Sequence, residues 1–222
     1  GYADYVLWDQ NGLPLALIEA KRSSTSAENG KVQARLYADC LERMYQQRPI
    51  IFYTNGYSIW LWDDQFYPPR EVAGFHNREA LSRMIWRRDQ RQPIENFTAN
   101  QQIVDRYYQQ HGIKRVMGNY DANRQRKSLI VMATGTGKTR LSIAVAEGLM
   151  KNNWVNRVLF LADRDALLTQ AEGAFKEHYP QASTARLGQG QQTANARIVF
   201  STYPAMMNAI DALDANGQRQ LA

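Results

Sequence analysis

The sequence contains very little cysteine and no long apolar run. Its one cysteine, Cys40, cannot form an intramolecular disulfide, and no neighbouring Cys or His suggests a zinc site. The longest apolar stretches, such as residues 129–133 and 158–162, are far shorter than the roughly 20 residues that a membrane-spanning helix requires. We therefore expect no transmembrane helix, no signal peptide and no membrane partner, and a reducing cytoplasm as the location.

The composition and charge of the 222 residues narrow the class of protein. Hydrophobic residues make up 44% and charged residues 22%, which is typical of a soluble globular protein with one or two cores and excludes a disordered or collagen-like chain. The net charge of +6 comes from residues 91–222, which carry 16 Lys and Arg against 10 Asp and Glu. This excess favours phosphate-bearing partners, although a solvated basic face without a partner would give the same count.

The first part of the sequence predicts two β-hairpins around a helix. Asn-Gly pairs, which strongly favour hairpin turns, occur at residues 11–12 and 55–56. The flanking residues predict strands over 2–8, 13–21, 50–54 and 57–62. Between the hairpins, apolar residues at helical spacing predict an amphipathic helix over 31–45, with its apolar stripe formed by Val32, Leu36, Tyr37, Cys40, Leu41 and Met44.

The second part alternates strands and helices, which favours a parallel sheet covered by helices and an α/β fold. Strands are expected over 129–132, 158–161 and 198–201, and helices over 141–150 and 166–175. Two prolines at 68–69 followed by an arginine-rich stretch mark the joint between the two parts. We divide the chain into a first domain over 1–68, an arginine-rich linker over 69–98 and a second domain over 99–222.

A glycine-rich segment over residues 133–139 reads Ala-Thr-Gly-Thr-Gly-Lys-Thr and lies between a predicted strand and a predicted helix. A turn at this place aims backbone N–H groups and a helix N-terminus at phosphate oxygens. We predict that Lys138 contacts the β- and γ-phosphates of ATP and that the Thr139 hydroxyl binds the Mg²⁺ of the nucleotide. The other ATP-binding candidates in this phosphate loop are Thr134, Gly135, Thr136 and Gly137.

The phosphate loop departs from the strict pattern at Met132, where that pattern has glycine. Its form, A-x-x-G-x-G-K-T, resembles that of superfamily-2 helicases and translocases, which implies a RecA-like lobe. Upstream, residues 106–109 resemble the superfamily's short motif whose glutamine reads adenine, so Arg106 and Gln109 are further ATP-binding candidates. A plain polar helix surface would also accommodate this run.

Two segments downstream of the loop resemble motifs Ia and Ib of the same superfamily. They are residues 163–170 and 201–203, each at the end of a predicted strand. The resemblance implies contacts with the DNA backbone, which suit a motor that moves along any sequence. These candidates are Arg164, Gln170 and Thr202, although Arg164 could instead form a surface ion pair with a neighbouring aspartate.

The motif D-E-x-H or D-E-x-D, which holds Mg²⁺ and orients the attacking water in this superfamily, does not occur in the sequence. The second lobe that would supply an arginine finger is also missing. We therefore expect an incomplete first RecA-like lobe, a fragment of a larger motor that hydrolyses little or no ATP by itself.

The first predicted hairpin brings two carboxylates together. In a two-residue turn at 11–12, opposed residues have numbers that sum to 23, so Asp4 faces Glu19 and Pro14 faces Asp9. Lys21 lies on the same face as Glu19. Two carboxylates about 5 Å apart repel each other unless a cation lies between them, so we predict that Asp4 and Glu19 bind Mg²⁺ and that Lys21 supports phosphodiester chemistry.

The pattern D-x14-E-x-K on a hairpin resembles the PD-(D/E)xK nuclease core. It is followed by Gln33 and Tyr37, which lie on one helical face and resemble the Q-x-x-x-Y motif of RecB-like nucleases. The resemblance implies catalytic roles for Asp4, Glu19, Lys21, Gln33 and Tyr37. A salt-bridging surface strand is the alternative for E-x-K, and core packing is the alternative for Tyr37.

A RecB-like nuclease core followed by a superfamily-2 ATPase lobe resembles the R subunit of type I restriction–modification enzymes. The resemblance implies ATP-dependent translocation of double-stranded DNA, Mg²⁺-dependent cleavage of unmethylated DNA away from the recognition site, and methyltransferase (M) and specificity (S) subunits as partners. Two alternatives stay open at this point. They are a superfamily-2 DNA-repair helicase with an inactive nuclease-like domain and a non-catalytic DNA-binding module.

Overall fold

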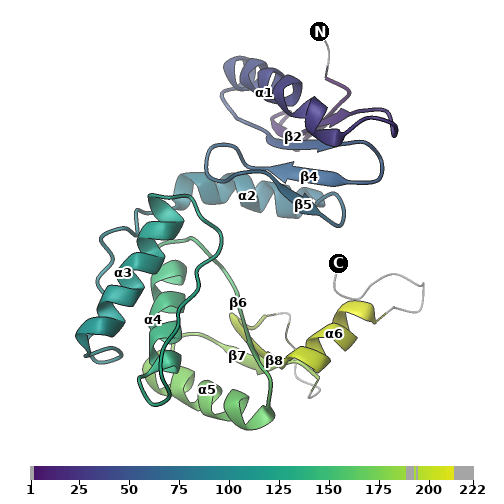
Figure 1. Ribbon diagram of the computed structural model, residues 1–222. Coiled ribbons are helices and arrows are strands. Elements are labelled where there is room, and N and C mark those ends of the chain that lie inside the picture. Colours follow the sequence, from purple (N-terminus) through teal and green to yellow (C-terminus); the bar gives the residue numbers. More distant parts are fainter. Residues whose placement is uncertain (1–2, 189–192, 194, 213–222) are drawn as a thin grey trace. The chain divides into compact units, whose positions relative to one another are not determined.

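The structure, a computed structural model, describes residues 3–188, 193 and 195–212 (Figure 1). The chain divides into two compact units, which we describe separately. Unit 1 comprises Gly1–Arg91 and Arg124–Arg126, and unit 2 comprises Gln92–Asn123 and Lys127–Ala222. None of the helices in the described part of the chain combines the length and the apolar character that crossing a bilayer requires.

Unit 1 is built on a five-stranded sheet. Its strands lie in the order β1 (Tyr5–Trp8), β2 (Pro14–Ala20), β3 (Ile50–Thr54), β4 (Ile59–Trp62) and β5 (Arg70–Val72). Strands β2 and β3 are parallel and the other pairs antiparallel. A parallel pair needs a long crossover, and here the short 3-10 helix η1 (Ala27–Gly30) and helix α1 (Lys31–Tyr45) supply it.

Helices α1 and α2 (Arg78–Gln90) cover opposite faces of this sheet (Figure 1). Leu81 of α2 packs with one core cluster, which includes Phe52, and Ala34 and Ala38 of α1 pack with the other, which includes Tyr53. Both clusters draw on β2 and β3, so these central strands are apolar on both faces, as a sheet covered on both sides requires.

Helix α1 has the predicted bounds, but the prediction of its apolar stripe was largely wrong. Ala34 and Ala38 are fully buried, whereas Val32, Leu36 and Met44 are 71%, 59% and 70% exposed. Small side chains let the helix backbone lie close to a sheet face that Tyr53 already fills, and larger residues at those positions would not fit. Of the predicted stripe, Tyr37 and Leu41 pack partly against this cluster, and Cys40 is exposed.

The turn of the first hairpin is one residue longer than predicted. Trp8 pairs with Pro14, and the Asp9 N–H donates to the Leu13 carbonyl at 2.9 Å, so the expected pair of Asp9 and Pro14 was wrong. The Asp9 carboxylate organises the turn by accepting the N–H groups of Asn11 and Leu13. A bulge between Leu7 and Trp8 then restores the predicted offset, so that β1 and β2 pair further along with numbers that sum to 23.

The second hairpin also has a longer turn than predicted. Strand β4 begins at Ile59 and not at Tyr57, because the Asn55 side chain accepts the N–H groups of Tyr57 and Ser58 and draws them into the loop. At Gly56 the backbone is left-handed, with φ of +89°, which glycine adopts without strain. In both hairpins a polar side chain therefore decides where pairing starts.

The segment predicted as a linker, 69–98, contains regular structure that belongs to unit 1. Strand β5 completes the sheet, and α2 buries Leu81 against it. Asn77 caps α2, since its side-chain oxygen accepts the Ala80 N–H at 2.9 Å. Unit 1 therefore continues to Arg91.

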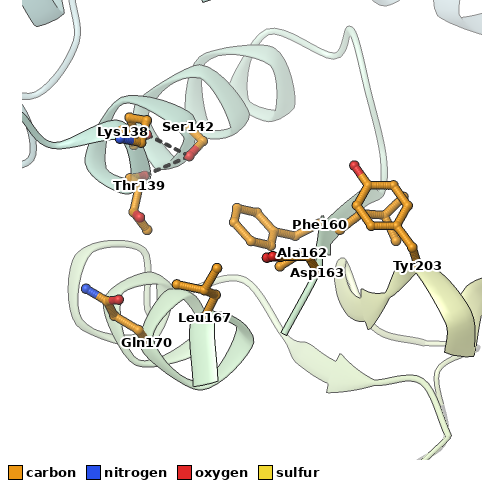
Figure 2. Close-up of a pocket in the computed structure, with 10 residues that line it drawn as sticks. Lys138, Thr139, Ser142, Phe160, Ala162, Asp163, Leu167, Gln170 and Tyr203 are labelled. Atoms are coloured by element: carbon orange, nitrogen blue, oxygen red, sulfur yellow. Dashed lines mark hydrogen bonds between the residues drawn. The ribbon is translucent and has the colours of Figure 1, made fainter. Parts of the chain in front are cut away.

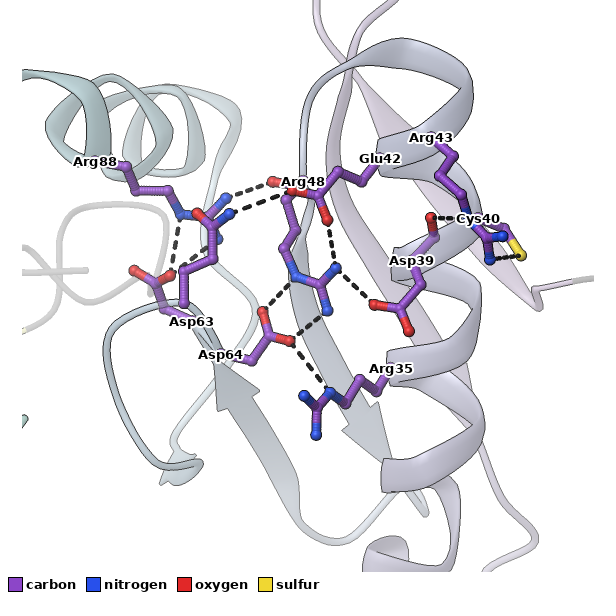
Figure 3. A network of polar contacts seen from close by, with 10 residues as sticks. Arg35, Asp39, Cys40, Glu42, Arg43, Arg48, Asp63, Asp64 and Arg88 are labelled. Atoms are coloured by element: carbon purple, nitrogen blue, oxygen red, sulfur yellow. Dashed lines mark hydrogen bonds and ion pairs between the residues drawn. The ribbon is translucent and has the colours of Figure 1, made fainter.

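A buried ion-pair network ties α1 and α2 to the strands of unit 1 (Figure 3). Arg48 donates to both carboxylate oxygens of Asp64 and, through Nη1, to Asp39 at 2.8 Å and Glu42 at 2.7 Å. The hydrogen bonds to Asp64, more than any other contact, raise the pKa of Arg48 above its ordinary value. Beside it, Arg88 of α2 pairs with the buried Asp63 at 2.9 Å.

We expect Arg48→Ala to lower the free energy of unfolding by about 3 kcal/mol, because the buried Asp64 carboxylate would lose its bidentate partner. Urea titrations of this chain, followed by circular dichroism, measure the change. The matched control is Arg43→Ala, which removes an exposed arginine from the same unit and should cost less than about 0.5 kcal/mol. Equal midpoints for the two variants would contradict the prediction.

Unit 2 contains a three-stranded parallel sheet in the order β6-β8-β7. Its elements are α3 (Tyr107–Asp121), α4 (Lys138–Lys151), β6 (Val158–Ala162), α5 (Asp165–His178), β7 (Thr184–Arg186), β8 (Ile198–Thr202) and α6 (Tyr203–Asp211). Phe160, Phe175 and Phe200 join the sheet to α5, with ring centroids 5.5 to 5.9 Å apart. The predicted parallel alternation is confirmed, and β7 is a strand that the sequence analysis missed.

The strand predicted over 129–132 was wrong. These residues form no regular element in the structure, and Leu129 and Val131 are 90% and 87% exposed. A strand exists only where a neighbour accepts its hydrogen bonds, and no strand of the described residues pairs with this segment. An apolar run alone is therefore insufficient evidence for a strand.

Candidate functional sites

The first site lies in unit 1, where β2 ends and α1 begins. Glu19, which is 2% exposed, is the last buried residue of β2, and Lys21 follows the end of the strand. The Lys21 Nζ donates to Glu19 Oε1 at 2.8 Å and to Gln33 Oε1 at 2.7 Å, and Gln33 Nε2 donates to the Tyr37 hydroxyl at 3.0 Å. The structure therefore joins four of the five predicted nuclease residues in one hydrogen-bonded chain.

Asp4, the fifth, lies just before β1 and joins the same place through the backbone. Its Oδ2 accepts the N–H of Ala20 at 2.8 Å, and Ala20 is the residue between Glu19 and Lys21. The bulge described above makes this possible, since it restores the register that brings the start of β1 to the end of β2. The Asp4 side chain remains exposed, and its other carboxylate oxygen is open to a ligand.

Glu19 carries a feature that suits a bound cation. Its Oε2 is buried and has no hydrogen-bond partner among the described residues. A buried carboxylate oxygen is costly unless a donor or a cation faces it. The described residues hold no cluster of three or more Asp, Glu, His or Cys, so any metal here would rely on Asp4, Glu19 and water. Mg²⁺ accepts such a set, because it keeps several waters and needs only one or two carboxylates.

Gly30, a residue that the sequence analysis did not single out, closes the back of this site. A Cβ atom at Gly30 would lie 3.2 Å from Glu19 Cγ, which is closer than ordinary contacts, and 3.4 Å from Lys21 Cε, which is van der Waals contact. The signal was available as a glycine directly ahead of a predicted helix, but only the folded chain shows which side chains occupy the space beside it. Glycine at position 30 therefore leaves the space that the Glu19 and Lys21 side chains occupy.

The second site lies in unit 2, at the phosphate loop. Gly135 and Gly137 adopt left-handed backbone conformations, with φ of +77° and +90°, and α4 begins directly after them at Lys138. Residues with a side chain rarely adopt these angles, so the backbone conformation of the loop favours glycine at both positions. Lys138 Nζ donates to the carbonyl oxygens of Met132 and Ala133 at 3.3 and 3.0 Å, so its charge lies over the loop. Loop residues Thr134 and Thr139 are exposed and half-buried, respectively.

Side chains of residues 106–109 form hydrogen bonds with this loop. Gln109 is only 2% exposed, and its amide donates to the Thr136 carbonyl at 2.8 Å. The Tyr108 hydroxyl donates to the same carbonyl at 3.1 Å and accepts a hydrogen bond from Arg106 Nη1 at 2.8 Å. The structure therefore connects Gln109 to the phosphate loop, whereas its reading of adenine stays a prediction.

A cavity of about 420 Å³ opens beside the phosphate loop (Figure 2). Lys138 and Thr139 of α4 face it together with Asp163 and Gln170. The other residues that line it are Ser142, Phe160, Leu161, Ala162, Leu167 and Tyr203. Of the three predicted DNA-backbone residues, Gln170 therefore lies beside the nucleotide candidates.

The other two predicted DNA-backbone residues have separate surroundings. Arg164 Nε lies 3.6 Å from Asp163 Oδ2, and both side chains are exposed, as in the ion pair considered from the sequence. Thr202 caps α6, since its hydroxyl oxygen accepts the Ala205 N–H at 3.3 Å. Their contact with DNA stays a prediction.

Comparison with known proteins identifies the class of this chain. Residues 102–221 match the family described as "Type III restriction enzyme, res subunit", and residues 1–70 match "Type I restriction enzyme R protein N terminus". Because the first match covers more than half of the chain, the chain belongs to this helicase-like family of restriction enzymes.

Curated relatives narrow the class further. The chain is 32% identical to the Type I restriction enzyme EcoAI endonuclease subunit of Escherichia coli over 192 residues, covering 77% of this chain and 22% of that protein. It is 29% identical to the EcoKI endonuclease subunit of E. coli strain K12 over 226 residues, covering 80% and 19%. These relatives and the match of residues 1–70 confirm the predicted relation to the R subunits of type I restriction enzymes.

A solved structure is also similar. It is a fragment of an HsdR subunit of a type I restriction enzyme from Vibrio vulnificus YJ016, 24% identical with a TM-score of 0.36, covering 93% of this chain and 38% of that chain. The present chain spans about a fifth of the length of the curated relatives that it matches.

Proposed function

We propose that this chain supplies the nuclease core, of the PD-(D/E)xK type, and the first ATPase lobe of a type I restriction endonuclease. The complete enzyme would use ATP to translocate double-stranded DNA and would cut unmethylated DNA away from its recognition site. The observation that carries the proposal is the hydrogen-bonded chain from Glu19 through Lys21 and Gln33 to Tyr37. Within it, the buried Oε2 of Glu19 has no hydrogen-bond partner among the described residues.

In the nuclease site, each residue has a distinct task. Asp4 and Glu19 would hold Mg²⁺, which when bound polarises the scissile phosphate and makes a bound water more acidic. Lys21 places a positive charge beside Glu19, where it can stabilise the negative charge that develops on the phosphate. Gln33 and Tyr37 position the Lys21 ammonium through consecutive hydrogen bonds. A solvated salt bridge would need neither of these two residues.

In the ATPase lobe, Lys138 would exchange its two loop carbonyls for the β- and γ-phosphates of ATP. Backbone N–H groups of Gly135, Thr136 and Gly137 and the N-terminus of α4 would face the phosphates, and Thr139 would hold the accompanying Mg²⁺. Arg106 and Gln109 would read the adenine edge, and Gln170, Arg164 and Thr202 would contact the DNA backbone. Methyltransferase and specificity subunits would complete the enzyme in a cytoplasm reducing enough for the free Cys40.

Plasmid cleavage and ATP turnover, measured side by side on the full-length subunit with its partner subunits, test this function. We expect cleavage that requires both Mg²⁺ and ATP turnover. ATP turnover without cleavage at any Mg²⁺ concentration would favour a helicase with an inactive nuclease-like domain. DNA binding without either activity would favour a non-catalytic DNA-binding module.

We expect Gly30→Ala to reduce cleavage about tenfold, equivalent to about 1.4 kcal/mol, with ATP turnover unchanged. The added methyl would press on Glu19 Cγ and shift the Glu19 side chain, a predicted metal ligand, by a few tenths of an ångström. Gly74→Ala is the matched control, since a Cβ at Gly74 meets nothing within 4 Å. Equal cleavage by the two variants would show that Gly30 does not position the site.

A further inference from the structure

Three arginines of unit 1 lie close enough to Tyr67 to act on its pKa, and a fourth, Arg70, lies close enough to Arg126 to be affected by its charge. We call them the arginine cluster: Arg70, Arg87, Arg91 and Arg126. Arg91 Cζ lies 4.8 Å from the ring centroid of Phe66 and 5.2 Å from that of Tyr67, and Arg126 Cζ lies 4.1 Å from the Tyr67 centroid. Arg87 precedes Arg91 by one helical turn, and Arg70 begins β5 three residues after Tyr67.

These positive charges act on one another. Burial, followed by the charges of Arg91 and Arg83, lowers the pKa of Arg87 below its ordinary value. Burial and the charge of Arg126 do the same for the pKa of Arg70, and burial does so for Arg126, where the charge of Arg91 acts in the same direction. Gathering these guanidinium groups therefore costs free energy in the isolated chain.

Asp63 is an acidic residue whose charge reaches the cluster. Asp63 acts on Arg126 in the opposite direction, but its carboxylate already accepts hydrogen bonds from Arg88. The Nε atoms of Arg70 and Arg87 are buried and have no hydrogen-bond partner in the described part of the chain. The cluster thus combines several positive charges with two buried N–H donors, those of Arg70 and Arg87, that lack an acceptor among the described residues.

A purely structural role explains only part of this arrangement. Cation–π contacts with Tyr67 and Phe66 stabilise Arg91 and Arg126, and the C-terminus of α2 favours nearby cations. Neither effect supplies an acceptor for the Nε atoms of Arg70 and Arg87. A ligand with several negatively charged oxygens would instead act on the charge of the cluster, because it would reduce the repulsion between the guanidinium groups.

We propose that the arginine cluster binds phosphate groups of a double-stranded DNA backbone. A planar guanidinium matches two phosphate oxygens at once, and contact with aromatic rings keeps the groups oriented before binding. Several guanidinium groups side by side call for several negative charges, which successive phosphodiesters of one strand provide. The proposal rests on DNA as the substrate in the proposed function, and it assigns the contact to residues that neither the nuclease site nor the phosphate loop contains.

The test measures binding of a short fluorescent duplex to the full-length subunit by anisotropy, with EDTA present so that no cleavage occurs. The variant combines Arg87→Gln with Arg126→Gln, and the control combines Arg43→Gln with Arg78→Gln, two exposed arginines of unit 1 outside the cluster. We expect the cluster variant to raise the Kd about tenfold and to reduce the slope of log K against log salt by about 2, since each phosphate contact contributes about 0.9. The control should stay within about twofold of the wild type.

Thermal unfolding distinguishes binding from structure. Because the substitutions relieve repulsion, the cluster variant should melt no lower than the control. Weaker binding accompanied by a lower melting temperature would overturn the proposal in favour of a structural role. Equal loss of binding in variant and control would overturn it in favour of unspecific charge.

Two further measurements distinguish a small anion from DNA as the ligand of the cluster, and a failure of this inference from a failure of the proposed function. Binding of inorganic phosphate that is lost in the cluster variant, together with the same duplex Kd for the cluster variant and the control, would indicate a small-anion site and overturn the proposal. Plasmid cleavage by the assembled enzyme is measured on the same two variants. Absence of cleavage together with cluster-dependent binding would count against the proposed function alone, whereas normal cleavage without cluster-dependent binding would count against this inference alone.

Discussion

Lys21→Ala should reduce DNA cleavage by the assembled enzyme about a thousandfold or more, equivalent to about 4 kcal/mol of transition-state stabilisation, while ATP turnover continues at the normal rate. The Lys21 ammonium contacts both Glu19 and Gln33, so its loss removes the positive charge of the site and the link to Tyr37. The phosphate loop lies in the other unit of the chain and keeps its own contacts. The measurement is plasmid cleavage beside phosphate release from ATP.

Lys31→Ala is the matched control for this variant. It removes a lysine from the same unit whose ammonium lies 3.8 Å from Glu28 and over the Trp62 ring, away from the hydrogen-bonded chain of the site. It should cleave normally. Normal cleavage by Lys21→Ala would mean that Asp4, Glu19 and Lys21 are structural and that the cutting site lies elsewhere, whereas loss of both activities would indicate misfolding.

The second large effect is expected at the phosphate loop. Lys138→Ala should lower ATP turnover at least a hundredfold, equivalent to about 2.7 kcal/mol, and should abolish translocation and ATP-dependent cleavage with it. Lys138 is the loop's mobile positive charge, and its present partners are backbone carbonyls that it can leave for phosphate oxygens. Phosphate release and displacement of a DNA-bound triplex strand measure the two activities.

Lys176→Ala provides the control, because Lys176 is an exposed lysine of unit 2 that pairs with Glu172 at 2.7 Å. Glu172 keeps Arg186 as a partner, so this substitution should leave both activities unchanged. Cleavage at the normal rate by Lys138→Ala in the absence of ATP turnover would refute the coupling between motor and nuclease.

Local patterns predicted much of the fold and part of the site. Helical periodicity predicted the bounds of α1, and the i,i+4 spacing placed Gln33 and Tyr37 on one face, where their side chains meet. Such relations depend on the geometry of one element, so neighbouring residues suffice to predict them. The approach of Asp4 to the end of β2 was predicted too, although the predicted turn was wrong and the bulge compensated for it.

Contacts between elements were harder to predict. The exposure of Val32, Leu36 and Met44 depends on the space that the sheet leaves beside α1. The helical spacing of apolar residues does not reveal that space. Among the described residues, no strand pairs with the apolar run over 129–132. Strand β7, by contrast, pairs with β8 in the parallel sheet. Strand pairing and burial depend on a segment and on the element that packs against it. The sequence of the segment alone does not describe that partner.

The order of the motifs, their residue types and the kind of chemistry that they support can be read from the sequence alone, because these follow from local composition and spacing. Tertiary structure decided which groups meet: Lys21 with Gln33, Gly30 behind Glu19, Gln109 with the phosphate loop. It also gathered the arginine cluster, which joins three arginines of the predicted linker, 69–98, to Arg126 of the predicted second domain. The physical reason is that hydrogen bonds, close packing and charge repulsion act over a few ångströms in space, between residues that chain folding brings together from distant positions.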